Sequence, residues 1–267
     1  MSMLEGIPSD AKIRSLLRRA TFGPRPSCPR CGSSEIRRSE NRFRCPRCRR
    51  PFSVTSCSWL SGAKVMPRQL WLLVLCWQRK IAFRTAQDLT GLSHVTVRRW
   101  FRRFRENLVQ ASPKLFGEVE VDEAWLGKRR HHNQTIVIGA VERGTGRAVV
   151  RVMGPRDQER SDRFLLRHVR RDSVVYTDGW EGYRGIDAFF GYGHSAHIHD
   201  RGDFGPTNHA ENLWSRLKGF IRRTWHHSWR EHLPGLLREF EARINNPETF
   251  VSPLAFLETC LYTVPTR

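Results

Sequence analysis

Two pairs of cysteines near the N-terminus place the strongest constraint on how this chain can fold. Cys28 and Cys31 form one C-x-x-C motif, and Cys45 and Cys48 form a second. Each motif makes a tight turn from which two thiolates reach one ion, and four thiolates complete the closed tetrahedral shell of a structural zinc site. A redox-active C-x-x-C would not require a matched second pair. We therefore expect a zinc ribbon over residues 27–57 that binds one Zn²⁺.

The remaining cysteines and the apolar runs indicate a cytoplasmic chain. The first residues lack the apolar core of a signal peptide, so the seven cysteines are expected to be thiols or metal ligands instead of disulfides. Cys57, Cys76 and Cys260 have no partner at ligand spacing and are expected to be ordinary buried or half-buried thiols. The longest apolar run, residues 70–77, is too short to cross a bilayer.

The charge of the chain points to nucleic acid. Its 267 residues include 46 Lys and Arg against 26 Asp and Glu, a net charge of +20. Such an excess favours a polyanionic partner. A basic surface that serves only solubility is the alternative, but positive charge of this size repels itself when no partner is bound.

A helical domain is expected over residues 58–112, after a short lead-in helix within residues 1–26. Pro67 begins one helix, Gly91 makes a turn, and Ser93 caps a helix with a buried apolar stripe. This pattern predicts a helix-turn-helix with a basic second helix. The arginines expected to contact DNA are Arg98, Arg99, Arg102 and Arg103. A helical hairpin that binds nothing is the alternative.

An α/β domain is expected over residues 113–267. The expected elements are strands at 117–127, 134–144 and 146–154, a helix at 157–171, a strand at 173–183, a short helix, a strand at 194–200, and helices at 208–224 and about 229–246. A meander of strands followed by alternating helices and strands predicts a mixed sheet with helices on its faces.

Three carboxylates in this domain suit divalent metal chemistry. Asp122 lies in the first strand, and Asp178 follows an apolar strand, at the sheet edge where sites cluster. Glu211 lies in the first turn of an amphipathic helix, with Lys218 two turns later on the same side. Carboxylate oxygens bind Mg²⁺, two such ions clamp a reacting phosphodiester, and lysine reaches a phosphate without competing for metal.

Each of these residues also has a purely structural interpretation. Glu211 could form a capping box with Asn208. Asp178 precedes a glycine and could be a turn residue, while Asp122 could pair with an arginine. A separate histidine cluster, His194, His197 and His199, has strand spacing that divides its members between two faces, which argues against a metal site there.

The ordered motifs resemble those of the prokaryotic insertion-sequence transposases with a DDE-type catalytic domain. The zinc ribbon, the helix-turn-helix, Asp122, TDGWEGY and PTNHAENLWSRLKG are most similar to the group whose third motif reads H-T-N-x-x-E-x-x-W-x-x-L-K. Pro206 stands where that motif often has His, and Cys57 where a Gly is common. The resemblance implies an RNase H-like mixed sheet flanked by helices, preceded by the small zinc ribbon and the helical domain.

The resemblance also implies the catalytic residues. Asp122 and Asp178 would be the catalytic aspartates, Glu211 the third ligand and Lys218 a phosphate contact. Asp178 and Glu211 are 33 positions apart, and Glu211 and Lys218 seven. Some members have Asn at the third place, which here is Asn208, but a carboxylate binds Mg²⁺ better than an amide.

The expected activity is that of a DNA transposase. It would bind the terminal inverted repeats of its own element, with Arg222 among the DNA contacts, and cleave and join DNA with Mg²⁺ or Mn²⁺, using two ions. The expected partners are double-stranded DNA and a second copy or higher oligomer of the chain, without a membrane, in a prokaryotic cytoplasm at the nucleoid. The alternatives are a DNA-binding regulator with an inert third domain and an RNase H-like nuclease for branched DNA.

Overall fold

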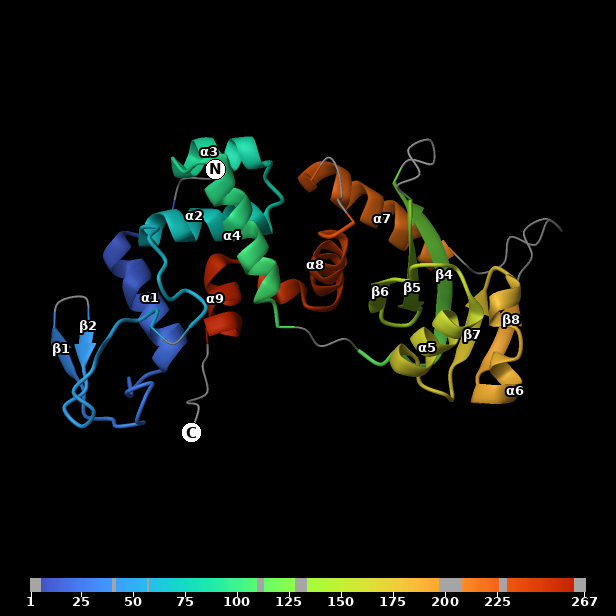
Figure 1. The fold of residues 1–267 in the computed structure, drawn as a ribbon, viewed down its shortest axis with the longest axis horizontal. Helices are drawn as coiled ribbons and strands as arrows, with labels where there is room; N and C mark the ends of the chain where they lie inside the picture. Colours follow the sequence, from blue (N-terminus) through green and yellow to red (C-terminus); the bar gives the residue numbers. More distant parts are fainter. Residues whose placement is uncertain are drawn as a thin grey trace. The chain divides into compact units, whose positions relative to one another are not determined.

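A computed structural model describes residues 6–39, 42–56, 58–109, 113–127, 134–196, 208–225 and 230–261. The chain forms two compact units (Figure 1). The first spans 1–109 together with 248–267, and the second spans 110–247. In the described part of the chain, no helix has the length and apolar character needed to span a bilayer.

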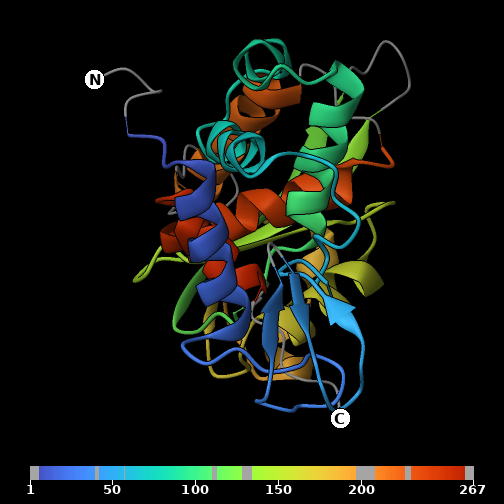
Figure 2. The ribbon, with the colours of Figure 1, turned by 90° about the vertical axis from the view of Figure 1, so that its left-hand side faces the viewer.

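The first unit begins with helix α1 (Asp10–Phe22) and a small antiparallel sheet of β1 (Arg37–Ser39), β2 (Arg42–Arg44) and β3 (Pro51–Phe52). The strands lie side by side in the order β1-β2-β3 (Figure 2). Phe22, Phe43 and Phe52 pack ring against ring, with centroids between 5.4 and 5.9 Å apart, beside the four ribbon cysteines. So small an aromatic core needs a metal or a disulfide to be stable.

Helices α2 (Pro67–Gln78), α3 (Phe83–Thr90) and α4 (His94–Glu106) form the helical part of this unit. Gly91 ends α3 in the left-handed region at φ 66°, which glycine adopts without strain. Ser93 Oγ then accepts the backbone N–H of Thr96 at 3.3 Å and caps α4. The expected helix–turn–helix geometry is therefore present in residues 83–106.

The C-terminal segment packs with the first unit, whereas the sequence suggested one domain over 113–267. Its described elements are η4 (Pro247–Phe250), which begins at the last residue of the second unit, and helix α9 (Pro253–Leu261). The Trp77 ring of α2 lies 5.0 Å from that of Phe256 and 5.2 Å from that of Phe250, centroid to centroid. The side-chain amide of Gln78 donates to the carbonyls of Thr249 and Ser252, both at 2.8 Å. The segment packs against α2 because these aromatic rings are buried together, a long-range contact that sequence spacing does not reveal.

The second unit is built on a five-stranded mixed sheet. Its strands are β4 (Glu118–Leu126), β5 (Thr135–Glu142), β6 (Ala148–Val152), β7 (Val174–Thr177) and β8 (Gly193–Ala196), in the order β6-β5-β4-β7-β8. The β4–β5 and β5–β6 pairs are antiparallel, and the β4–β7 and β7–β8 pairs are parallel. The predicted mixed sheet flanked by helices is confirmed.

Helices cover both faces of this sheet (Figure 1). Helices α7 (Asn208–Trp225) and α8 (Leu233–Asn245) pack on the face that carries Ala124 and Leu126 of β4. Helix α5 (Gln158–His168), η2 (Glu181–Tyr183) and α6 (Ile186–Phe190) pack on the opposite face, which carries Val119 and Val121. The alternation of side chains along β4 therefore directs Glu120 and Asp122 toward α7.

Glu120 of β4 holds the start of α7. Its side chain is fully buried, and Oε2 accepts the backbone N–H groups of His209 and Ala210 at 2.8 and 2.9 Å. Oε1 pairs with Nε of Arg143 at 2.7 Å and with Nδ1 of His209 at 2.9 Å. A carboxylate at a helix N-terminus satisfies amides that have no partner inside the helix. The ion pair with Arg143 is therefore only part of the role of Glu120, which also anchors the first turn of α7.

Replacing Glu120 by Ala is expected to lower the free energy of unfolding by about 3 kcal/mol, because Arg143 loses a buried partner and two helix amides lose their acceptor. The same change at Glu118 is the matched control: its side chain is 57 % exposed and lies 3.7 Å from Arg143. It should cost less than about 1 kcal/mol. Urea unfolding measures both, and equal losses would contradict the buried role of Glu120.

Candidate functional site

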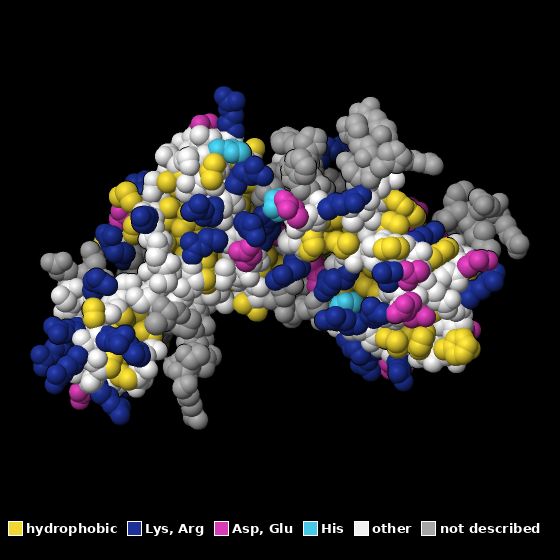
Figure 3. Space-filling model, viewed as in Figure 1, with side chains coloured by type: hydrophobic (Ala, Val, Ile, Leu, Met, Phe, Trp, Pro, Cys, Tyr) yellow, Lys and Arg dark blue, Asp and Glu magenta, His cyan; other side chains and the backbone are white. Residues whose placement is uncertain are grey.

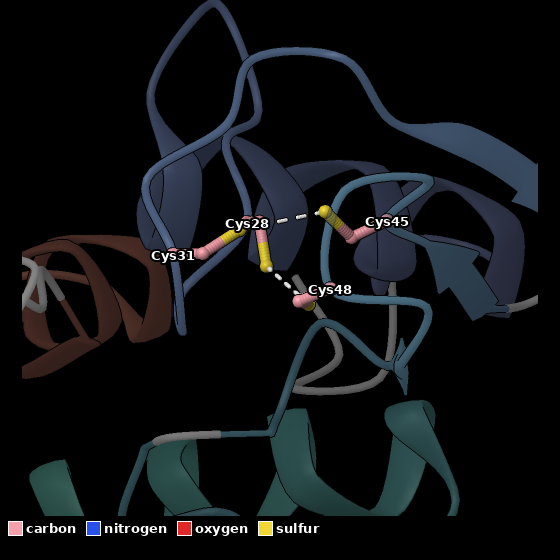
Figure 4. Close-up of side chains that lie close together, drawn as sticks. All are labelled: Cys28, Cys31, Cys45 and Cys48. Carbon is pink, nitrogen blue, oxygen red and sulfur yellow. Dashed lines mark hydrogen bonds between the residues drawn. The ribbon is translucent and has the colours of Figure 1, made fainter.

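The four ribbon cysteines converge on one point (Figure 4). The sulfurs of Cys28 and Cys48 lie 3.7 Å apart, and those of Cys31 and Cys45 lie 3.5 Å apart. A tetrahedral zinc with Zn–S bonds of about 2.3 Å places its sulfurs roughly 3.8 Å apart. The set therefore fits a structural Zn²⁺, as predicted.

Of the other cysteines, Cys76 is buried and Cys260 is half-buried, as expected, and Cys57 lies outside the described residues.

Replacing Cys48 by Ser should abolish stoichiometric zinc binding, because three thiolates leave the tetrahedral shell open. Hydrogen exchange should then show loss of protection over residues 28–52 only. Cys260→Ala is the control and should keep its zinc. Full zinc content in Cys48→Ser, measured by elemental analysis, would exclude the four-cysteine site.

Asp122 and Asp178 lie side by side because β4 and β7 are parallel neighbours. The register pairs Glu120 with Tyr176, so Asp122 and Asp178 follow two positions later on adjacent chains. Asp122, Glu123 and Asp178 each place one carboxylate oxygen within 4.8 Å of the others. Three carboxylates at this separation are a donor set suited to a hard divalent cation such as Mg²⁺.

Both aspartates are held by one main-chain and one side-chain donor. Asp122 accepts the backbone N–H of Glu123 at 2.8 Å and the indole N–H of Trp214 at 2.9 Å. Asp178 accepts the backbone N–H of Trp180 at 3.1 Å and an N–H of Arg156 at 3.3 Å. Each carboxylate oxygen can accept a second contact, so both side chains are oriented and still able to bind a cation. Burial raises the pKa of Asp122.

Arg156 lies at the centre of this acidic group. It pairs with Glu123 at 2.7 Å and with Asp178 at 3.3 Å, and its guanidinium lies 4.1 Å from the ring centroid of Trp180 and 5.3 Å from that of Trp125. Side-chain alternation along β4 places Glu123 on the face opposite Asp122. The Glu123 carboxylate nevertheless lies close to that of Asp178. This is possible because β7 ends at Thr177 and leaves the edge of the sheet open there.

Glu123 is itself nearly inaccessible. It accepts a hydrogen bond from the hydroxyl of Tyr183, and burial raises the pKa of its carboxyl group. A carboxylate this deep requires a cation or strong donors to remain ionised. Arg156 supplies that cation. The only sequence signal for Glu123 was its position directly after Asp122.

The predicted α7 residues differ in their placement. Glu211 and Lys218 are exposed, and Glu211 is not part of the carboxylate group found among the described residues. Helical spacing puts Glu211 one turn before Trp214 and Lys218 one turn after it, so both flank the indole that contacts Asp122. Asn208 instead lines a hollow of about 270 Å³ with His209, Asn212 and Arg216, beside Gly146 at the β5–β6 turn.

The arginines predicted to bind DNA lie in two kinds of environment. Arg98, Arg99 and Arg102 are exposed on α4, and Arg222 is exposed on α7. Arg103 is half-buried, with its guanidinium 4.6 Å from the Trp100 ring centroid. The ribbon adds a basic cluster that sequence analysis did not single out, visible at the left of Figure 3. The exposed arginines of β1 and β2 belong to it: Arg37, Arg38, Arg42 and Arg44.

The histidine cluster is described only at His194. Its Nε2 lies 3.0 Å from the hydroxyl of Thr177, and burial lowers the pKa of the ring. His197 and His199 lie outside the described residues, as does Pro206.

Replacing Arg156 by Gln is expected to tighten Mn²⁺ binding about tenfold, a change of about 1.4 kcal/mol. The reason is that one positive charge leaves the immediate surroundings of Asp178. Arg163→Gln is a matched control, since it removes the same charge from an exposed pair with Glu159 on α5. Titration calorimetry measures both affinities. Weaker or unchanged Mn²⁺ binding in Arg156→Gln would show that this arginine does not oppose the metal.

Comparison with known proteins agrees with this arrangement. Residues 8–51 match the family model described as a transposase zinc-ribbon domain, and residues 114–245 match that described as an ISXO2-like transposase domain. Comparison with curated proteins gave no match. A chain in the cryoEM structure of the simian T-cell lymphotropic virus intasome in complex with PP2A regulatory subunit B56 gamma is similar at 14 % identity and a TM-score of 0.39, over 66 % of this chain and 68 % of that one. A likeness this weak carries no argument. On the two family models, the chain belongs to the IS1595 family of insertion-sequence transposases.

Proposed function

We propose that this protein binds the terminal inverted repeats of its own insertion sequence, cleaves the DNA there and joins the freed 3′ ends to target DNA. The observation that carries the proposal is the closeness of the Asp122 and Asp178 carboxylates, which the adjacent parallel strands β4 and β7 bring together. The two oriented carboxylates, with the exposed glutamate and lysine that flank Trp214 along α7, would provide the ligands and the phosphate contact that phosphodiester chemistry requires.

Asp122, Asp178 and Glu211 would hold the divalent ions, Mg²⁺ or Mn²⁺, and this class of reaction uses two such ions. When bound, the ions would supply the Lewis acidity that activates a water molecule or a 3′ hydroxyl and offsets charge on the phosphate oxygens. The chain's own residues orient the substrate. Lys218 places a point charge on a phosphate one turn from Trp214, and Asn208 assists from the flank of α7.

DNA recognition is assigned to the first unit and to α7. Arg98, Arg99 and Arg102 on α4, the half-buried Arg103 and Arg222 on α7 contact phosphates or the groove. The zinc ribbon presents its own exposed arginines. Because an insertion sequence has two ends, the working assembly contains at least two copies of the chain. It acts on double-stranded DNA at the nucleoid of a prokaryotic cell.

Asp122→Asn and Asp178→Asn are each expected to reduce Mg²⁺-dependent strand transfer about a thousandfold or more. Losing a ligand of the reacting metal removes several kcal/mol of transition-state stabilisation, and each tenfold step in rate is about 1.4 kcal/mol. Asp172→Asn, at an exposed aspartate paired with Arg170 just before β7, is the control and should retain activity. Strand transfer that survives in either catalytic variant would refute the mechanism.

The same assay separates the alternatives. Specific binding to element ends without any Mg²⁺-dependent cleavage would identify a DNA-binding regulator. Cleavage of branched DNA without joined products would identify a structure-specific nuclease.

Glu211→Gln compared with Asn208→Ala decides the third ligand, since only loss of a true ligand should approach the effect of Asp122→Asn.

A further inference from the structure

Trp214 connects α7 to Asp122 through a contact that its packing alone would not require. The side chain is 5 % exposed, and its indole N–H donates to Oδ2 of Asp122 at 2.9 Å. Its six-membered ring lies over Gly139, the register partner of Asp122 on β5. A Cβ at position 139 would lie 2.6 Å from Cη2 of Trp214, so glycine at this position makes room for the indole.

The indole is a donor of a particular kind. It has one N–H, accepts no hydrogen bond in the ring plane and carries no charge. It therefore orients Asp122 without competing for metal and without repelling it. Arg156, the side-chain donor to Asp178, carries a positive charge that opposes a cation. The two aspartates thus have donors with opposite consequences for metal binding.

Helix α7 is fastened to β4 at two points on the same face of that strand. Glu120 binds the backbone N–H groups of His209 and Ala210, and Asp122 binds Trp214. Glu211 lies in the chain between these two points. Because α7 is held to β4 on both sides of Glu211, this residue has little freedom to shift along the helix axis or to rotate about it.

We propose that Trp214 is a positioning residue, whose indole N–H fixes both the orientation of Asp122 and the placement of Glu211 so that these carboxylates share a divalent cation. The inference rests on the proposed function, since it requires Asp122 to be a metal ligand. It concerns how the site is assembled, and Trp214 itself touches neither metal nor substrate.

The test removes the hydrogen bond and keeps an aromatic ring at this position. Trp214→Phe in the full-length, zinc-loaded protein is expected to weaken Mn²⁺ binding about 10- to 100-fold, the usual effect of losing a partner of a metal ligand. Leu217→Ala is the matched packing control, because Leu217 is fully buried in the same core one turn along α7. It should lower the melting temperature and leave the Mn²⁺ affinity within about twofold of wild type.

A second replacement protects the test against misfolding. Trp214 replaced by 3-benzothienylalanine keeps the outline of the indole and exchanges only the N–H for sulfur. It should reproduce the weakened Mn²⁺ binding without the cavity that Trp214→Phe creates, and so with a smaller fall in melting temperature. Wild-type Mn²⁺ affinity in this variant would overturn the inference.

Asp122→Asn separates that outcome from failure of the proposed function. If Asp122→Asn binds Mn²⁺ as tightly as wild type, Asp122 is not a ligand and the proposed metal site is wrong. If Asp122→Asn loses Mn²⁺ while the Trp214 variants keep it, the metal site stands and only the positioning role fails.

Discussion

The parallel pairing of β4 with β7 is the constraint on which the second unit depends. Its register sets Asp122 beside Asp178, although 56 positions separate them in the chain, and the end of β7 at Thr177 leaves both carboxylates at an open edge. A shift of one residue would turn Asp122 to the face of α5, because side chains alternate along a strand. Val119 and Val121 resist such a shift, since both are fully buried against the α5 face.

The acidic strand is stable in this basic chain because each of its buried carboxylates has dedicated donors. Glu120 receives two helix amides and Arg143, Asp122 receives an amide and an indole, and Glu123 receives Arg156 and the Tyr183 hydroxyl. Leaving such a group without partners costs several kcal/mol. Side-chain alternation places Glu120 and Asp122 on one face of β4 and Glu123 on the other. An arginine pairs with a buried glutamate on each face, Arg143 with Glu120 and Arg156 with Glu123.

Much of this architecture follows from local sequence patterns. The cysteine spacing, the strand alternation and the Gly91–Ser93 turn predict elements that the structure contains, because they depend on neighbouring residues only. Asp122 and Asp178 were also identifiable, since each ends or interrupts an apolar strand. The contacts of Trp214 with Asp122 and of Gln78 with Thr249 were not, because they join residues 92 and 171 positions apart and no local pattern records them.

Residue type alone does not predict the role of a charged side chain where its burial decides that role. Glu118 and Glu120 look alike in sequence, yet one is exposed and the other anchors α7. Arg105 resembles its neighbours on α4 but is buried, and Arg103 packs on tryptophan. The same distinction applies at the metal site. A neutral indole donates to Asp122 and a charged guanidinium to Asp178, and only the guanidinium carries a charge that opposes a cation bound at the proposed site.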